Sequence, residues 1–193
     1  MNFASTPLLL SLALLVLLVI VAFSSGTEVA MLSVNRFRIR HRAQSGDRQA
    51  RALERLLQKP DEWLGANLVI LAGASVFASA IATILAQRTG QRYAVPLAGA
   101  LLTIIVIVFC ELAPKIYGAA QPEGVALHAA GIYRVLVGVA RPVLWLTNTL
   151  AYGFLRLFGV ARATRSDQSL SAEELRTIVT EAAPVIPARH RQM

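Results

Sequence analysis

Long uncharged apolar stretches alternate with short, strongly basic ones along this chain. Three of the apolar stretches have the length of about 20 residues that a helix needs to cross a bilayer. They lie at about residues 3–27, 63–87 and 93–113. The first could instead be a signal peptide, but no Lys or Arg precedes its apolar core, as a signal peptide requires. The pattern predicts an all-α membrane protein with three transmembrane helices and the N-terminus outside.

The next apolar segment is interrupted by charge. Arg134 and the pair Arg141-Pro142 leave uncharged pieces that are too short to cross a bilayer at the helical rise of about 1.5 Å per residue. We therefore expect a belt of two juxtamembrane helices, at about 124–140 and 142–158, along the cytoplasmic face. A tilted fourth span is the alternative, and it would put the C-terminus outside. The expected interfacial anchors are Tyr133, Arg134, Trp145, Tyr152 and Arg156.

Positive charge is concentrated between the first two apolar stretches. The loop from Leu32 to Glu62 carries eight positive residues, whereas the turn from Arg88 to Arg92 carries two. Because positive loops remain in the cytoplasm, this loop and the C-terminus are expected inside. The eight residues are Arg36, Arg38, Arg40, Arg42, Arg48, Arg51, Arg55 and Lys59. Hydrophobic residues make up 55% of the chain and charged ones 16%, so the net charge of +8 is interpreted as a topology signal rather than a nucleic-acid-binding surface.

Two polar segments outside the spans have helical patterns. Within the basic loop, Asp47 to Gln58 is predicted to form a solvated helix with a narrow apolar stripe, and Trp63 marks the interface where the second span begins. Beyond residue 161, Ser171 and Glu174 form a capping-box pattern that predicts a short acidic cytoplasmic helix over 172–182.

The third apolar stretch ends in an acidic residue close to a proline. A carboxylate at Glu111, inside the bilayer edge, costs roughly 2.5 kcal/mol or more unless something compensates it. Pro114 removes a backbone donor, which frees the carbonyl of Cys110 and bends or ends the helix. Carboxylate and carbonyl oxygens suit a hard cation such as Mg²⁺ or Na⁺. Taken alone, the motif is better explained by an ordinary helix end with a snorkelling Lys115 and a glutamate at the rim.

Polar groups interrupt all three stretches at one expected depth, near the inner leaflet. Ser25-Gly26-Thr27-Glu28 ends the first stretch and Asn67 opens the second, at the level expected for Glu111. Each group alone could be a helix cap, since Ser-x-x-Glu is a capping box and Asn often starts a helix. Their common depth favours a cation site between the helices. A membrane enzyme that uses Glu28 and Glu111 as an acid/base pair is not excluded by residue types.

Small residues fill the second stretch from Ala72 to Thr83. Small side chains let a second helix approach closely within a membrane. A homodimer is the inference.

Three motifs in this order resemble a known family. Phe-Ser-Ser-Gly-Thr-Glu-Val-Ala at 23–30, Gly-Ala-Asn-Leu-Val at 65–69 and Glu-Leu-Ala-Pro-Lys at 111–115 are similar to the signatures of the transmembrane module of CorC/CNNM (cyclin M) magnesium transporters. The resemblance covers about residues 5–160. It implies a homodimer in the cell (inner) membrane that is not an enzyme and exports Mg²⁺ by alternating access, coupled to Na⁺ entry. The metal-binding residues it implies are Ser25, Gly26, Thr27, Glu28, Asn67, Ser75 and Glu111.

The chain departs from the family pattern at two places. The family has asparagines where this chain has Ala66 and Ile70, which supports an alternative function as a non-transporting membrane scaffold or regulatory subunit. The family also continues into nucleotide-binding domains of the cystathionine-β-synthase (CBS) type. With residues 1–160 as the transmembrane module and 161–193 as the start of a cytoplasmic connector, we expect no CBS domain and no nucleotide site here, in either a truncated piece or a short natural form.

Overall fold

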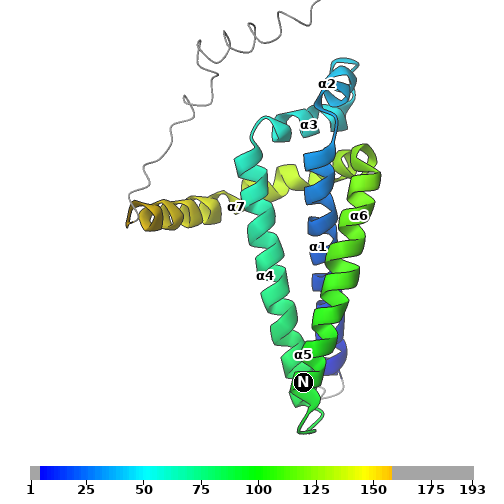
Figure 1. Ribbon diagram of the computed structural model, residues 1–193, viewed down its shortest axis with the longest axis vertical. Coiled ribbons are helices and arrows are strands. Elements are labelled where there is room, and N and C mark those ends of the chain that lie inside the picture. The colour runs from blue at the N-terminus through cyan, green and yellow to red at the C-terminus, as the bar shows by residue number, and fades with distance from the viewer. Residues whose placement is uncertain (1–4, 158–193) are drawn as a thin grey trace, which may run out of the picture. The chain divides into compact units, whose positions relative to one another are not determined.

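The computed structural model describes residues 5–157, and this part of the chain is helical with short connections and no strand (Figure 1). The predicted all-α class is therefore confirmed. The helices are α1 Ser5–Ser33, α2 Arg36–Gln44, α3 Arg48–Leu57, α4 Pro60–Gln87, α5 Ala94–Ile105, the π-helix η1 Val106–Leu112, α6 Ala113–Ala120 and α7 Pro122–Leu157.

Within residues 5–157, four helical segments are long and apolar enough to cross a membrane, judged by length and composition. They are Thr6–Ser33, Pro60–Gln87, Ala94–Ala120 and Pro122–Thr147. The first three correspond to the three predicted spans, and the fourth adds a candidate span where two juxtamembrane helices were predicted. In Figure 1, α1, α4 and the α5–η1–α6 segment run alongside one another, whereas the part of α7 up to Thr147 runs crosswise to them.

The predicted break near Arg141-Pro142 is wrong, because α7 is one continuous helix from Pro122 to Leu157 with Pro142 inside it. A proline in a helix interior removes one hydrogen bond and strains the turn before it. Here Ala140 and Leu144, on either side of Pro142, are buried in the same apolar cluster. Packing on both sides therefore keeps the helix intact across the proline.

Two helices also extend beyond their predicted ends. α1 continues to Ser33. The next helix, α2, begins after its N-cap Asn35, whose side chain accepts from the N–H groups of Phe37 and Arg38. The third span passes Pro114 and ends at Ala120. Seven residues of π-helix, Val106–Leu112, precede Pro114 and take up the disturbance that was expected to bend or end the helix.

The largest apolar core lies where the end of α1, the loop helices α2 and α3, the start of α4 and the stretch of α7 from Ala126 to Leu144 meet. Trp63 and Tyr133 belong to this core and are 1% and 0% exposed. The predictions that Trp63 marks the membrane interface and that Tyr133 is an interfacial anchor are wrong, because a side chain inside the core cannot reach lipid headgroups. Trp145 is 71% exposed, and its role as an anchor stays a prediction.

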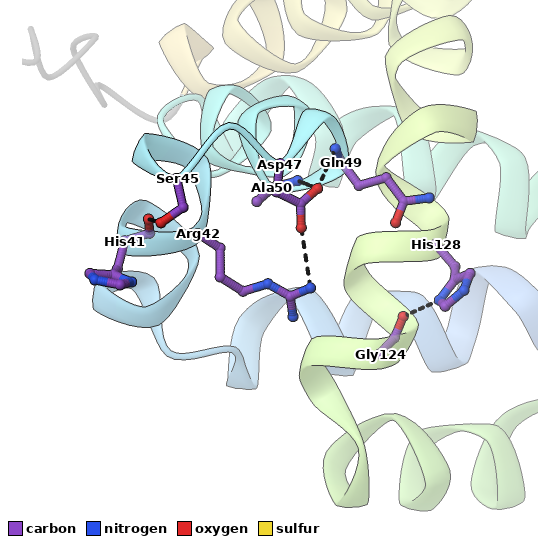
Figure 2. A network of polar contacts seen from close by, with 8 residues as sticks. All are labelled: His41, Arg42, Ser45, Asp47, Gln49, Ala50, Gly124 and His128. Atoms are coloured by element: carbon purple, nitrogen blue, oxygen red, sulfur yellow. Dashed lines mark hydrogen bonds and ion pairs between the residues drawn. The ribbon is translucent and has the colours of Figure 1, made fainter.

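The predicted loop helix is confirmed as α3 (Figure 2). Asp47 caps it by accepting from the N–H groups of Gln49 and Ala50, at 2.9 and 3.2 Å, and it also pairs with Arg42 at 3.1 Å. Gly46 precedes the cap with a φ of 99°, which only glycine adopts without strain. α2, which was not predicted, is tied to α7 by an ion pair of 2.9 Å between Arg38 and Glu123. The predicted acidic helix at 172–182 lies outside the described residues.

Candidate functional site between α1, α4 and η1–α6

α1 lies between α4 and the η1–α6 segment and packs against both. Three consecutive residues of α1 are buried, Ser25, Gly26 and Thr27, and the next one, Glu28, is half-buried. The helix continues without interruption through these residues to Ser33. The capping box that was the alternative explanation of residues 25–28 is therefore not present. Instead, the motif presents polar groups to the helices on either side.

The first polar contact joins three helices. The Asn67 amide on α4 donates to a Glu28 carboxylate oxygen on α1, with 3.1 Å between nitrogen and oxygen. The Tyr133 hydroxyl of α7 donates to the Asn67 carbonyl oxygen. Tyr133 is held in turn by Phe23, with ring centroids 6.2 Å apart, and interacts with the buried Ser24. Asn67 lies two turns inside α4, so it is not a helix cap.

The second polar contact joins α1 to the π-helix. The Ser25 hydroxyl donates to the main-chain carbonyl oxygen of Glu111, at 3.3 Å. In a regular helix that oxygen would accept from the N–H group four residues further along. The π-helix changes this register, as the bond from the Ala113 N–H to the Val108 oxygen, five residues back, demonstrates. Ser25 thus contacts the main-chain oxygen of Glu111, whereas the prediction named the Glu111 carboxylate and the Cys110 carbonyl.

Glycines bring α1 and α6 into backbone contact beside these polar groups. A Cβ atom added to Gly26 would lie 2.9 Å from the Pro114 oxygen, and one added to Gly118 would collide with the Gly26 oxygen. The absence of a side chain at Gly26 therefore allows the backbones of α1 and α6 to approach each other closely. It places the first and third sequence motifs against each other.

An apolar layer lies on the N-terminal side of the polar groups of α1. Val21, Ala74 and Cys110, from α1, α4 and η1, pack in one buried cluster. Val21 precedes Ser25 by four residues, or about 6 Å along the helix. The polar groups of α1 are thus sealed by apolar packing on the side that leads toward Ser5.

The remaining predicted residues divide into two cases. The Thr27 hydroxyl is buried and has no hydrogen-bond partner among the described residues. A buried hydroxyl without a partner costs free energy, so its presence calls for a ligand or another explanation. The Ser75 hydroxyl instead donates to the Leu71 carbonyl of its own helix at 2.8 Å, two turns from Asn67.

The oxygens of the site are suited to a cation. Because the Ser25 hydroxyl donates its proton to the Glu111 carbonyl, its lone pairs remain free to face a positive charge. One Glu28 oxygen accepts from Asn67, and the other has no hydrogen-bond partner within the described helices. No three His, Cys, Asp or Glu side chains gather around one point within residues 5–157. A cation here would therefore rely on hydroxyl, amide and backbone oxygens besides carboxylates.

Comparison with known proteins identifies the family of this chain. The family model described as the cyclin M transmembrane N-terminal domain matches residues 12–185. The chain belongs to this family. The resemblance drawn from the three motifs is confirmed, and the chain is a cyclin M (CNNM) domain of a multi-pass membrane protein.

The chain is also similar to several curated proteins. The UPF0053 inner membrane protein YfjD of Escherichia coli K12 is 37% identical over 172 residues, which cover 89% of this chain and 40% of that protein. A UPF0053 protein of Haemophilus influenzae is 35% identical over 185 residues, 95% of this chain and 44% of the relative. A polyamine export protein of the same organism is 25% identical over 185 residues, 89% and 42% of the two chains. The chain spans less than half the length of these relatives.

Sequence reasoning missed two members of the site. Tyr133 was assigned to the membrane interface because an aromatic residue beside an arginine is typical of that position. Only the packing of α7 against α4 reveals its contact with Asn67. Gly118 was not singled out, although a glycine one turn after Pro114, opposite the Gly26 of the first motif, is a signal of close helix approach.

Proposed function

We propose that this domain transports Mg²⁺, with the ion passing between α1, α4 and η1 at the level of Glu28, Asn67 and Glu111. The observation that carries the proposal is the half-buried Glu28 carboxylate, which Asn67 holds by one oxygen while the other has no partner in the described helices. A carboxylate in an apolar helix bundle is costly unless it serves an ion. In the proposed cycle, entry of Na⁺ drives export of Mg²⁺ as the site opens alternately to the two sides.

The proposed topology has three spans, with α7 along the inner membrane face. The crosswise course of α7 up to Thr147 supports this placement (Figure 1). Eight positive residues lie between α1 and α4 and two in the turn after α4, which favours a cytoplasmic position for α2 and α3. The N-terminus is then outside.

A homodimer remains part of the proposal. Exposed residues of α4 include Ala72, Val76, Phe77 and Ser79, so one face of this helix combines small and large apolar side chains. Such a face suits a second membrane helix.

Mg²⁺ is preferred over a polyamine as substrate because of the site's chemistry. Mg²⁺ takes six oxygens at about 2.1 Å, and closely spaced hydroxyl, carboxylate and carbonyl oxygens suit it. A polyamine needs carboxylates spaced along an extended chain. The described span Thr6–Ser33 has only one Asp or Glu, Glu28, and the described span Ala94–Ala120 has only Glu111. The polyamine export relative makes this substrate the second candidate.

Flux measurements test the proposal. The purified protein in liposomes, with an internal Mg²⁺ indicator and an imposed Na⁺ gradient, is expected to move Mg²⁺. Glu28→Gln and Asn67→Ala should each reduce the rate at least about tenfold, a loss of about 1.4 kcal/mol of ion stabilisation. Thr83→Ala is the matched control, since the exposed Thr83 hydroxyl bonds only to the Ser79 carbonyl of its own helix.

Two results would contradict magnesium transport. Spermidine flux that depends on Glu28, without Mg²⁺ flux, would assign the protein to polyamine export. An intact folded protein that moves neither cation would favour the non-transporting scaffold, for which Ala66 and Ile70 are the sequence argument.

A further inference from the structure

A basic cavity lies between the loop helix α3, the start of α4 and the middle of α7. Its volume is about 560 Å³. Six positively charged side chains line it, and Glu62 is the acidic residue in its lining. The six are Arg48, Arg51, Arg55, Lys59, Arg134 and Arg141.

Most of this charge is not neutralised within the described part of the chain. Lys59 pairs with Glu62 at 3.0 Å. Arg51 donates to the Gly46 carbonyl at 2.9 Å. The other four arginines are exposed and form no ion pair with any residue from 5 to 157. The cavity therefore carries a strong positive potential with room for an anion.

Membrane topology alone does not explain this convergence. A positive loop between two spans suffices to retain it in the cytoplasm, wherever its side chains point. Arg134 and Arg141 come from a different element, about two turns apart on α7, and line the same cavity as the arginines of α3. Gathering like charges is unfavourable unless a counter-charge is bound.

The surroundings indicate which anion fits. α7 exposes a series of apolar side chains close to these arginines in sequence: Val135, Val139, Val143, Trp145 and Leu146. The same helix therefore carries the cavity arginines and exposed apolar residues suited to acyl chains. A ligand that satisfies both features has an anionic head and an apolar tail.

A second basic cavity adjoins the first and shares Arg48 and Arg134 with it. His128 of α7 and Gln49 of α3 add polar groups to its lining, and Figure 2 shows both side chains. Arg48 and Arg134 thus lie between two spaces, each able to accept a phosphate.

We propose that these two cavities bind the headgroup of an anionic phospholipid with two phosphates, of the diphosphatidylglycerol (cardiolipin) class. Arginine suits phosphate because its planar guanidinium donates two parallel hydrogen bonds. Basic pockets at the cytoplasmic side of membrane helices bind such headgroups. The proposal rests on the placement of α7 along the inner face and does not depend on which ion is transported.

Lipid retention by the whole protein tests it. The protein is purified in detergent, mixed with cardiolipin, phosphatidylglycerol or phosphatidylcholine, and examined by native mass spectrometry. Cardiolipin is expected to remain bound, and phosphatidylcholine is not. The double variant Arg134→Gln/Arg141→Gln should weaken cardiolipin binding at least about tenfold. The control Arg36→Gln/Arg40→Gln removes the same charge from exposed loop positions outside the cavity and should bind as wild type does.

Three results would overturn the proposal. One is equal loss of cardiolipin in the test and control variants, which would mean that only net charge matters. Another is inorganic pyrophosphate binding as tightly as cardiolipin, which would assign the cavities to a soluble phosphate compound. The third is no retained cardiolipin in the wild type. Glu28→Gln should retain the lipid fully, so a failure of the transport proposal would leave this result unaffected.

Discussion

The backbone contact between α1 and α6 leads to a sharp prediction about Gly118. Replacement by alanine places a Cβ atom into the carbonyl oxygen of Gly26, so a main-chain atom must move. A flexible side chain could rotate away, but a helix backbone cannot move without shifting its neighbours. Overpacking of a tight contact costs about 1–3 kcal/mol, and we expect Gly118→Ala to fall at the upper end.

Gly26→Ala is expected to cost less. Its Cβ atom would lie 2.9 Å from the Pro114 oxygen, which calls for a smaller shift. Gly99→Ala is the control on the same span, because nothing lies within 4 Å of an added Cβ there. Since alanine favours a helix more than glycine does, this control should raise stability by up to about 1 kcal/mol.

Apparent melting temperatures in detergent measure the series. A loss of about 3 kcal/mol corresponds to a fall of about 6–12 °C for a chain of this size. The expected order of stability is Gly99→Ala, wild type, Gly26→Ala, Gly118→Ala. A Gly118→Ala protein that melts with the wild type would refute the close contact between α1 and α6.

Three further predictions concern single side chains. The pKa of Asp47 lies below its usual 3.8, chiefly because the Ala50 N–H donates to the carboxylate. The ionised carboxylate therefore stabilises the fold above pH 3.8, and this stabilisation is lost as the pH falls through the lowered pKa. The melting temperature should fall in strong acid, and it should fall less in Asp47→Asn. Tyr133→Phe leaves the buried Asn67 oxygen without its donor and should cost about 1–3 kcal/mol in denaturant unfolding. A smaller loss is expected in the background Asn67→Ala, where only the interaction with Ser24 remains to be lost. Thr27→Val removes a buried hydroxyl that has no partner in the described helices, so stability should rise by about 1 kcal/mol while Mg²⁺ flux falls; a fall in both would mean that the hydroxyl serves the fold.

Much of the fold follows from local pattern. The positions of α1, α4 and the third span follow from the length of the apolar stretches, and that of α3 follows from its apolar stripe. What failed was the treatment of α7, where Arg134 and Pro142 were given the role of interruptions. Burial of Ala140 and Leu144 in a core shared with distant helices outweighs the local effect of the proline. A single sequence does not reveal that tertiary packing.

The site could be predicted in composition but only partly in geometry. Contacts between α1 and each of its two neighbours were expected from the common depth of the motifs, and the Glu28–Asn67 and Ser25–Glu111 contacts agree with it. The second partner of Asn67, Tyr133, could not be predicted, because it lies 66 residues away on a helix whose course was misjudged.

The stretch around Glu111 separates what a sequence can and cannot specify. Pro114 indicated a disturbed helix, and a disturbance is present as the π-helix Val106–Leu112. The atom that Ser25 contacts is nevertheless the main-chain oxygen of Glu111, which is present whichever residue occupies that position. It follows that Glu111→Gln keeps the contact between α1 and η1 while removing the carboxylate charge. The backbone contact and the carboxylate can therefore be separated by experiment, since Ser25→Ala breaks the first and leaves the second in place.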